Sequence, residues 1–317
     1  MKFIDLFAGV GGFRYGLSAV RPIQPNNTER SESNNNIENQ SQQRECLDYF
    51  QCVYSNEWDK YANSVYRKHF GECDDRDIRT VPSSDIPDHD LLVGGFPCQA
   101  FSVAGKRAGF DDTRGTLFFE IARILRDKRP RYFILENVKG LLSHDSGKTF
   151  QTILRVLSDI GYGVQWQVLN SKDFGVPQNR ERIFIVGHLR GTPRPKVFPI
   201  GSTNSKALSE LTRGQSQGFR VYETSGISTT IASQAGGLGA KTGLYAVTAG
   251  YEMAIRRLTP IECERLQGFP DCWTATGADG EKISDTQRYK MMGNAVTTLV
   301  ITEIGRKLIQ TKEVNQI

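Results

Sequence analysis

Cys98 and Glu136 are the two residues whose chemistry stands out in this sequence. Cys98 follows Pro97 in a loop that has Gly95 and Gly105 on either side. A cysteine thiolate is a strong nucleophile, although a free thiol of pKa ~8.5 is only a few per cent ionised at neutral pH. Glu136 follows a neighbouring predicted strand, and a carboxyl group in a dry pocket keeps a proton to donate. Together they predict nucleophilic catalysis assisted by an acid; an isolated Cys98 would instead be an inert loop residue.

Two arginines enter a later predicted strand. Arg180 and Arg182 are two residues apart, so along a strand their side chains point to the same side and can face one site. The alternative is a pair of surface arginines at a strand entrance.

A glycine-rich turn near the N-terminus indicates a ligand site. Gly9 and Gly11 lie between an apolar run at 3–7 and a helical pattern at 13–20, an arrangement that brings backbone N–H groups to a ligand. Such a site also needs an acid after the next strand. Without the polar segment 25–45, Glu57 lies 27 residues after Gly9, close to the ~20 expected for an acid that binds ribose.

These residues must be positioned by an alternation of strands and helices. Apolar runs predict strands at 3–7, 50–55, 90–93, 131–135, 164–169 and 182–186, and amphipathic spacing predicts helices at 13–20, 61–70, 116–127 and 149–160. This rhythm favours an α/β fold with a doubly wound, mostly parallel sheet. Ligands then gather at the carboxyl ends of the strands.

The pattern changes after Gly187, which suggests a division into domains. Residues 188–256 are rich in Gly and Ser with short β-like pieces, so we expect domain 1–187, a smaller irregular domain 188–256, and a return to the first domain over 257–317. Thr259, Pro260 and Glu262 have the spacing of a helix start with a capping box, and Gly268 follows its end. A final helix is expected to begin near Asn294.

Composition excludes several classes of protein. The chain has 317 residues, 38% apolar and 24% charged, and no apolar run long enough to span a bilayer. The net charge is +5, and residues 106–131 alone carry an excess of four positive charges, typical of a solvated helix face or of a polyanion partner. The six cysteines form no C-x-x-C pair and no metal site with the four histidines. We expect a cytoplasmic protein without a metal, and we interpret the Asn-rich segment 25–45 as a disordered insertion.

These residues lie in blocks that resemble the bacterial DNA (cytosine-5)-methyltransferase family, of restriction-modification type. The similarity includes the Gly-Phe-Pro-Cys-Gln sequence around Cys98 and the Glu-Asn-Val sequence at Glu136. The blocks follow the family order and occupy residues 5–12, 56–58, 94–102, 114–118, 136–138, 178–182, 257–260, 264–270 and 293–296. Only the insertion and much of 188–256 are unmatched.

The resemblance implies a covalent mechanism. The Cys98 thiolate would add to carbon 6 of cytosine while Glu136 hydrogen-bonds or protonates ring nitrogen 3, so that carbon 5 attacks the methyl group of S-adenosylmethionine. Arg180 would help hold the base, and Arg182 would support the pocket.

The resemblance also assigns a cofactor wall. Phe7 and Trp58 would flank the adenine, Gly9 and Gly11 would allow close approach, and Glu57 would bind the ribose. Further residues of the wall are Asp77 and Ile78 near the adenine amine, and Pro97, Leu117 and Asn294. For Phe7, Trp58 and Leu117 the alternative is simple core packing.

Double-stranded DNA is the implied partner, from which the target base must be flipped out. The loop after Cys98 would close over the nucleotide with Ser102, Lys106, Arg107 and Arg114, and residues 188–256 would read the sequence, with Thr230 and Lys241 in the part that reaches DNA. Some relatives have a serine where this chain has Ala104, so the residue that enters the DNA is left open.

Three alternatives compete with this hypothesis. One is an RNA cytosine-5 methyltransferase of the same fold, and another is a DNA-binding protein that has lost catalysis, which would have lost Cys98, Glu136 or Arg180. A nicotinamide-linked enzyme would leave the cysteine and the two arginines without a role. The hypothesis implies a monomer that acts alone or beside a separate restriction endonuclease.

Overall fold

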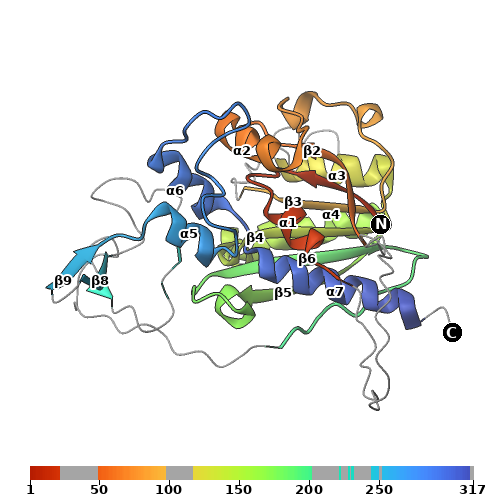
Figure 1. Ribbon diagram of the computed structural model, residues 1–317. Coiled ribbons are helices and arrows are strands. Elements are labelled where there is room, and N and C mark those ends of the chain that lie inside the picture. Colours follow the sequence, from red (N-terminus) through yellow and green to blue (C-terminus); the bar gives the residue numbers. More distant parts are fainter. Residues whose placement is uncertain are drawn as a thin grey trace, which may run out of the picture.

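The protein is built on one six-stranded sheet (Figure 1). The computed structural model describes residues 1–21, 49–97, 117–201, 221–222, 228, 230–231, 244–249 and 252–314. The strand order is β2-β1-β3-β4-β6-β5. The strands are β1 (Lys2–Leu6), β2 (Gln51–Asn56), β3 (Leu91–Gly95), β4 (Tyr132–Val138), β5 (Tyr162–Asn170) and β6 (Glu181–Leu189). The first four pair in parallel, and β6 runs antiparallel to both of its neighbours. The predicted α/β fold with a mostly parallel sheet is therefore confirmed.

Helices cover both faces of the sheet (Figure 1). Each face of the sheet carries an apolar core, and alternate residues of β1 point into one or the other. Ile4 and Leu6 pack with α3 and α4, whereas Phe3 packs with α1 and α7. A third apolar cluster joins α2, α5 and α6 around Val10. The helices are α1 (Gly12–Ser18), α2 (Lys60–Phe70), α3 (Leu117–Lys128), α4 (Lys148–Asp159), α5 (Pro260–Leu266), α6 (Asp285–Asn294) and α7 (Thr298–Val314).

The prediction for the C-terminal helices was wrong in one respect. Asn294 does not begin the final helix; it is the last residue of α6, and α7 begins at Thr298. The buried residues of α6 include Met291 and Met292, which are adjacent and give no helical period. The start of α5 is as expected, because Thr259 and Glu262 form a reciprocal capping box.

A smaller three-stranded sheet lies apart from the main one (Figure 1). It consists of β7 (Val221–Tyr222), β8 (Leu244–Ala249) and β9 (Glu252–Arg256). Before it, residues 193–201 run along the main sheet, where Gln165 Nε2 donates to Pro195 O and Gln167 Nε2 to Ile200 O. The domain limits at 188 and 256 stay a prediction, and the 25–45 segment lies outside the described residues.

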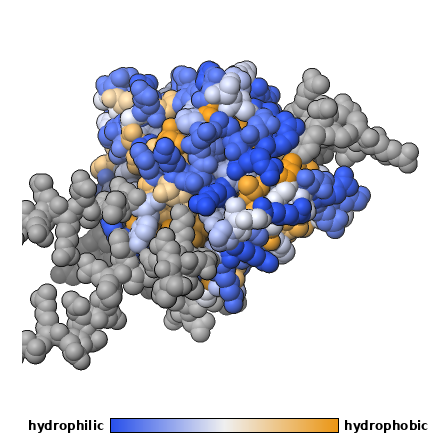
Figure 2. All heavy atoms as spheres, turned by 90° about the vertical axis from the view of Figure 1, so that its right-hand side faces the viewer, coloured by the Kyte–Doolittle hydropathy of each residue, from blue (hydrophilic) through white to orange (hydrophobic). Residues whose placement is uncertain are grey.

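The surface is mainly polar on the face drawn in Figure 2, where apolar atoms form small separate groups. Among the described residues, no helix is both long and apolar enough to cross a membrane. Of the cysteines in the described part of the chain, Cys263 is buried, Cys52 and Cys73 are half-buried and Cys272 is exposed, all as free thiols.

Candidate active site

Most of the predicted catalytic and cofactor residues line one cavity of about 400 Å³. The cavity lies where β1, β3 and β4 end and β6 begins, because the antiparallel β6 has its first residues at that edge. Residues of α6 close it from the C-terminal part of the chain. The lining residues include Phe7, Gly9, Glu57, Trp58, Pro97, Leu117, Glu136, Arg180, Arg182 and Asn294.

The glycine turn and Glu57 are joined by hydrogen bonds at one wall of this cavity. The Gly9 N–H donates to Glu57 Oε2 over 2.8 Å, and the Asp59 N–H donates to Oε1 over 2.8 Å. Burial raises the pKa of Glu57, and these two hydrogen bonds oppose the rise. Each carboxyl oxygen keeps a lone pair, so the side chain is fixed in place and can still accept a hydrogen bond.

The two predicted glycines of the turn have different surroundings. Gly9 has φ +56°, and a Cβ built there would meet no atom within 4 Å, so its backbone is open to a ligand. Gly11 has φ +87°, lies outside the lining of the cavity, and would place a Cβ onto the ring of Phe70. Gly11 is therefore required by its left-handed backbone and by its packing against α2.

A smaller cavity of about 80 Å³ adjoins the same turn. Phe7, Trp58, Ile78 and Leu117 line it together with Asp77. Core packing is the wrong interpretation for Trp58, which is 66% exposed, whereas Phe7 and Leu117 both pack on the core and face the cavities. The Asp77 carboxylate accepts hydrogen bonds from Arg79 and caps the 3-10 turn Ile78–Thr80.

Glu136 and Arg182 form an ion pair inside the larger cavity. Arg182 Nε lies 3.0 Å from Glu136 Oε1. Burial raises the pKa of Glu136, while the charges of Arg182 and Arg180 lower it, and the net direction is upward. A Cβ at Gly95 would lie 3.1 Å from Glu136 Oε2, so the small residue at the end of β3 leaves room for the carboxyl group.

Arg180 has a different set of partners from Arg182. Its guanidinium donates to three backbone carbonyls, those of Ile231, Gly293 and Ala295, at 2.8 to 3.2 Å. Burial lowers the pKa of Arg180 to about 9, so the side chain is still cationic at neutral pH. The residue is 1% exposed, and its bonds tie the start of β6 to Ile231 and to the 293–295 segment at the end of α6.

Cys98 lies just beyond a described and well-anchored segment. The residue itself, with Ser102, Lys106, Arg107 and Arg114, falls outside the described residues. The Asn137 side chain, which is buried, donates from Nδ2 to Phe96 O over 2.8 Å. Asn137 thus fixes the chain two residues before Cys98. Sequence reasoning assigned it no role, although an amide within a buried apolar strand is a usable signal.

Of the residues expected to contact DNA, Thr230 is the one that falls within the described part of the chain. Its hydroxyl donates to Asn179 O, beside Arg180, and the adjacent Ser228 and Asn179 are joined by a backbone hydrogen bond. Lys241 lies outside the described residues. The segment around Thr230 is therefore attached directly to the strand entrance that carries both arginines.

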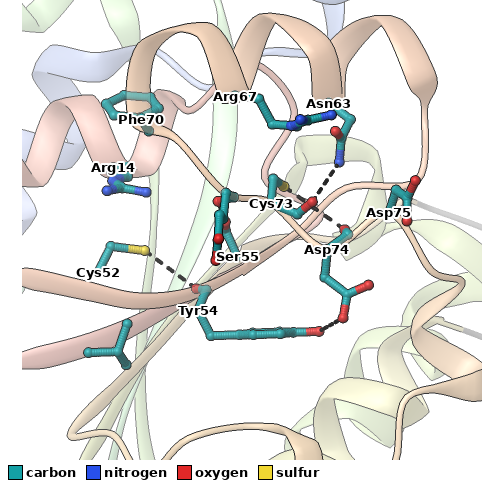
Figure 3. Close-up of a pocket in the computed structure, with 12 residues that line it drawn as sticks. Arg14, Cys52, Tyr54, Ser55, Asn63, Arg67, Phe70, Cys73, Asp74 and Asp75 are labelled. Carbon is teal, nitrogen blue, oxygen red and sulfur yellow. Dashed lines mark hydrogen bonds between the residues drawn. The ribbon is translucent and has the colours of Figure 1, made fainter. Parts of the chain in front are cut away.

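A further cavity, of about 700 Å³, lies between β2 and α2 (Figure 3). None of the predicted site residues lines it. Its polar groups bond to one another: Tyr54 donates to Asp74 Oδ2 over 2.8 Å, and Asn63 donates to Cys73 O. Arg14 lies beneath the ring of Phe70, 4.7 Å from its centroid.

Comparison with known proteins decides the family. The model of the C-5 cytosine-specific DNA methylase family matches residues 1–218 and 198–310. The chain belongs to this family. It is 36% identical to the Type II methyltransferase M.HhaI of Haemophilus parahaemolyticus, over 96% of this chain and 93% of the relative. It is 39% identical to the Type II methyltransferase M.HaeII of Haemophilus aegyptius, over 98% of this chain and 93% of the relative. The predicted enzyme class, a DNA (cytosine-5)-methyltransferase, is thereby confirmed.

Solved structures agree on the fold. The S. pombe Dnmt2 methyltransferase superimposes with a TM-score of 0.70 and 18% identity, covering 98% of both chains. The Spodoptera frugiperda DNMT2 mutant gives 0.67 and 19%, covering 97% of this chain and 99% of its own. At this level of identity the similarity concerns the fold alone.

Proposed function

We propose that this enzyme flips a cytosine out of duplex DNA, within a short specific sequence, and transfers a methyl group from S-adenosylmethionine to carbon 5. The observation that carries the proposal is the pairing of Glu136 with Arg182 in the cavity onto which the Gly9–Glu57 wall opens. A methyl donor and a base must meet in one space for transfer, and this cavity borders both groups of residues.

The cofactor would be held by the wall that Gly9 and Glu57 form. The open space at Gly9 and the remaining lone pairs of Glu57 suit a ribose with two hydroxyl groups. Phe7, Trp58 and Leu117 would enclose an aromatic base, with Asp77 and Ile78 at its edge. Pro97 and Asn294 complete the wall. When bound, S-adenosylmethionine supplies an electrophilic methyl group.

The acid at Glu136 would act on the flipped base. Because burial raises its pKa, the carboxyl group keeps a larger share of its protons near neutral pH and donates to ring nitrogen 3. The Cys98 thiolate forms a bond to carbon 6, and the electron pair displaced from the ring reaches carbon 5. After methylation, a water molecule takes the carbon-5 proton, the electron pair of that C–H bond re-forms the double bond between carbons 5 and 6, and the carbon–sulfur bond breaks with its pair on sulfur. Ring nitrogen 3 then returns its proton to Glu136, which restores the thiolate and the acid.

Arg182 is the arginine placed to act beside the base. Both arginines line the cavity, but the Arg182 guanidinium orients the Glu136 carboxyl group, whereas both terminal nitrogens of Arg180 donate to backbone carbonyls. We therefore assign contact with the base to Arg182 and the support of the pocket to Arg180, which reverses the roles expected from the resemblance.

We further propose that residues 188–256 read the DNA sequence, and that the loop with Ser102, Lys106, Arg107 and Arg114 closes over the flipped nucleotide. The chain would act as a cytoplasmic monomer, alone or beside a cognate restriction endonuclease. The Type II names of the relatives support a place in a restriction-modification system.

Methyl transfer from labelled S-adenosylmethionine to mixed-sequence duplex DNA tests the proposal. We expect label at carbon 5 of cytosine in one short motif, read by bisulfite sequencing, and its loss in Cys98→Ala. The matched control is Cys272→Ala, since Cys272 is an exposed free thiol. Cofactor binding without transfer to DNA would contradict the proposal, and transfer to RNA in the same assay would establish the alternative substrate.

A further inference from the structure

The glycine turn after β1 has its polar backbone groups bonded on several sides. Ala8 N donates to Asn56 O over 3.0 Å, and Gly11 N donates back to Ala8 O over 2.9 Å. The carbonyl of Val10, in the middle of the turn, accepts the indole N–H of Trp273 over 3.0 Å. Val10 itself lines the cavity of about 400 Å³ that contains Glu136 and Arg182. One side chain from the far end of the sequence therefore holds the turn.

Trp273 is itself rigidly held. It is 7% exposed, and its ring stacks on that of His69 with centroids 3.6 Å apart and planes 5° from parallel. His69 Nε2 also lies 2.8 Å from Trp273 O. Because a carbonyl only accepts, the imidazole carries a proton on Nε2. Tyr15 and Phe269 pack against the same indole, so its N–H points in one direction.

The turn needs such support because of its backbone. Phe7, Gly9 and Gly11 all have positive φ, between 55° and 87°. A phenylalanine in the left-handed region is strained, and such a conformation persists where its surroundings enforce it. The bond from Trp273 fixes the carbonyl between Gly9 and Gly11, and with it the direction in which the turn presents its N–H groups.

We propose that Trp273 is a positioning residue for cofactor binding, which acts through the Val10 carbonyl and without contact to the cofactor. This inference rests on the proposed use of the cavity for S-adenosylmethionine. A turn released from the indole N–H samples other conformations, and binding then has to order it again.

Two replacements at this position isolate the hydrogen bond. Trp273→Phe keeps an aromatic ring but removes the N–H, and 3-benzothienylalanine in place of Trp273 keeps the shape of the indole with sulfur where the N–H was. The second replacement preserves the packing, so it remains informative if the first does not fold. The matched control is Trp166→Phe, because Trp166 is 46% exposed on β5.

Titration calorimetry with S-adenosylhomocysteine measures the effect. We expect the Kd to rise about three- to tenfold in both replacements, as for the loss of one hydrogen bond, and to be unchanged in Trp166→Phe. KM for S-adenosylmethionine should rise while kcat stays the same, since uniform binding is lost. In the absence of cofactor, amide exchange at residues 9–12 should be faster in both Trp273 replacements than in the native protein.

The outcomes separate this inference from the proposed function. Native affinity in both replacements would overturn the positioning role, while leaving the cofactor site intact. A native protein that binds no S-adenosylhomocysteine would instead overturn the proposed function. A fall in kcat with native KM and Kd would mean that Trp273 acts elsewhere, and it would also contradict the inference.

Discussion

Arg182 Nε lies 3.0 Å from Glu136 Oε1, and the two side chains are only 15% and 12% exposed. The pair joins β4 to the antiparallel β6 at the edge where the parallel strands end. Burial and the arginine charges act in opposite directions on the carboxyl group, and burial has the larger effect. The protonation of Glu136 thus depends on the balance between burial and the arginine charges, and substitution of Arg182 changes that balance.

Glu136→Gln should reduce methyl transfer by about 100- to 10,000-fold, because an amide hydrogen-bonds but does not transfer a proton. Binding of S-adenosylhomocysteine should be unchanged. Single-turnover kinetics with labelled cofactor measure the rate of methyl transfer, and calorimetry measures the binding of S-adenosylhomocysteine. Glu181→Gln is the control, since Glu181 pairs with Lys139 at the exposed start of β6. A native rate in Glu136→Gln would exclude this carboxyl group as the acid.

Arg182→Gln should shift the pH profile of the reaction. The charge of Arg182 lowers the pKa of Glu136, so its removal raises that pKa. The acid form of Glu136 then persists to higher pH, so the alkaline limb of the profile shifts to higher pH. The maximal rate falls, because Arg182 no longer orients the carboxyl group. Profiles of kcat/KM between pH 6 and 9 measure the shift, with Arg190→Gln as control because Arg190 bonds to Ser158 away from the cavity. An unmoved limb would contradict the coupling.

Arg180→Lys should destabilise the protein by about 3 kcal/mol, because buried carbonyls lose their donors. Urea unfolding measures the loss, and Arg155→Lys on the exposed face of α4 provides the comparison. Full stability with abolished methyl transfer would argue instead that Arg180 acts on the base.

Asp5→Asn should change how stability depends on pH. Asp5 is fully buried in β1, and burial raises its pKa well above the usual value although the charge of Arg14 opposes the rise. The folded state therefore holds this proton more tightly than the unfolded state. Its stabilising contribution is complete below the unfolded pKa of ~3.9 and is lost as pH rises towards the folded pKa.

Over that range the native protein should lose up to about 1.4 kcal/mol per pH unit relative to Asp5→Asn. Denaturant unfolding of both proteins at several values between pH 4.5 and 8 measures the difference. Parallel pH curves for the two proteins would mean that Asp5 is ionised in the fold.

Thr259→Ala should cost about 1 kcal/mol, because Thr259 forms a capping box with Glu262 at the start of α5. Ser284→Ala is a matched control, since Ser284 precedes α6 without a side-chain capping bond, and it should cost less. Thermal unfolding of the two variants compares them. Equal losses would show that the capping box adds nothing beyond a small polar residue.

The position of the cavity could be predicted from the sequence because it follows from strand direction. Glu57 and Glu136 occur at or near the ends of apolar runs, and parallel strands bring such ends to one edge. The direction of β6 is not encoded in its composition, since a buried strand is apolar in either direction. Arg182 is the second residue of β6, so this antiparallel strand contributes its beginning, and not its end, to the cavity.

Other features have no local signal. The partners of Arg180 and Trp273 are backbone carbonyls up to 263 residues away, and a carbonyl is present at every position of a chain. The helix α6 was missed because its adjacent methionines form no stripe. In each case the decisive contact depends on packing between distant segments, which periodicity does not describe.

The cavity has one wall from Phe7 and Gly9 and another from Met291, Gly293 and Asn294. Because synthesis proceeds from the N-terminus to the C-terminus, a ribosome releases the first wall long before the second. Until then a nascent chain lacks the indole of Trp273 against its glycine turn and the carbonyls that bind Arg180. The cavity is thus completed only after Trp273 and residues 291–295 have been synthesised, so a chain that stops before them carries the glycine turn and Glu136 without the cavity that unites them.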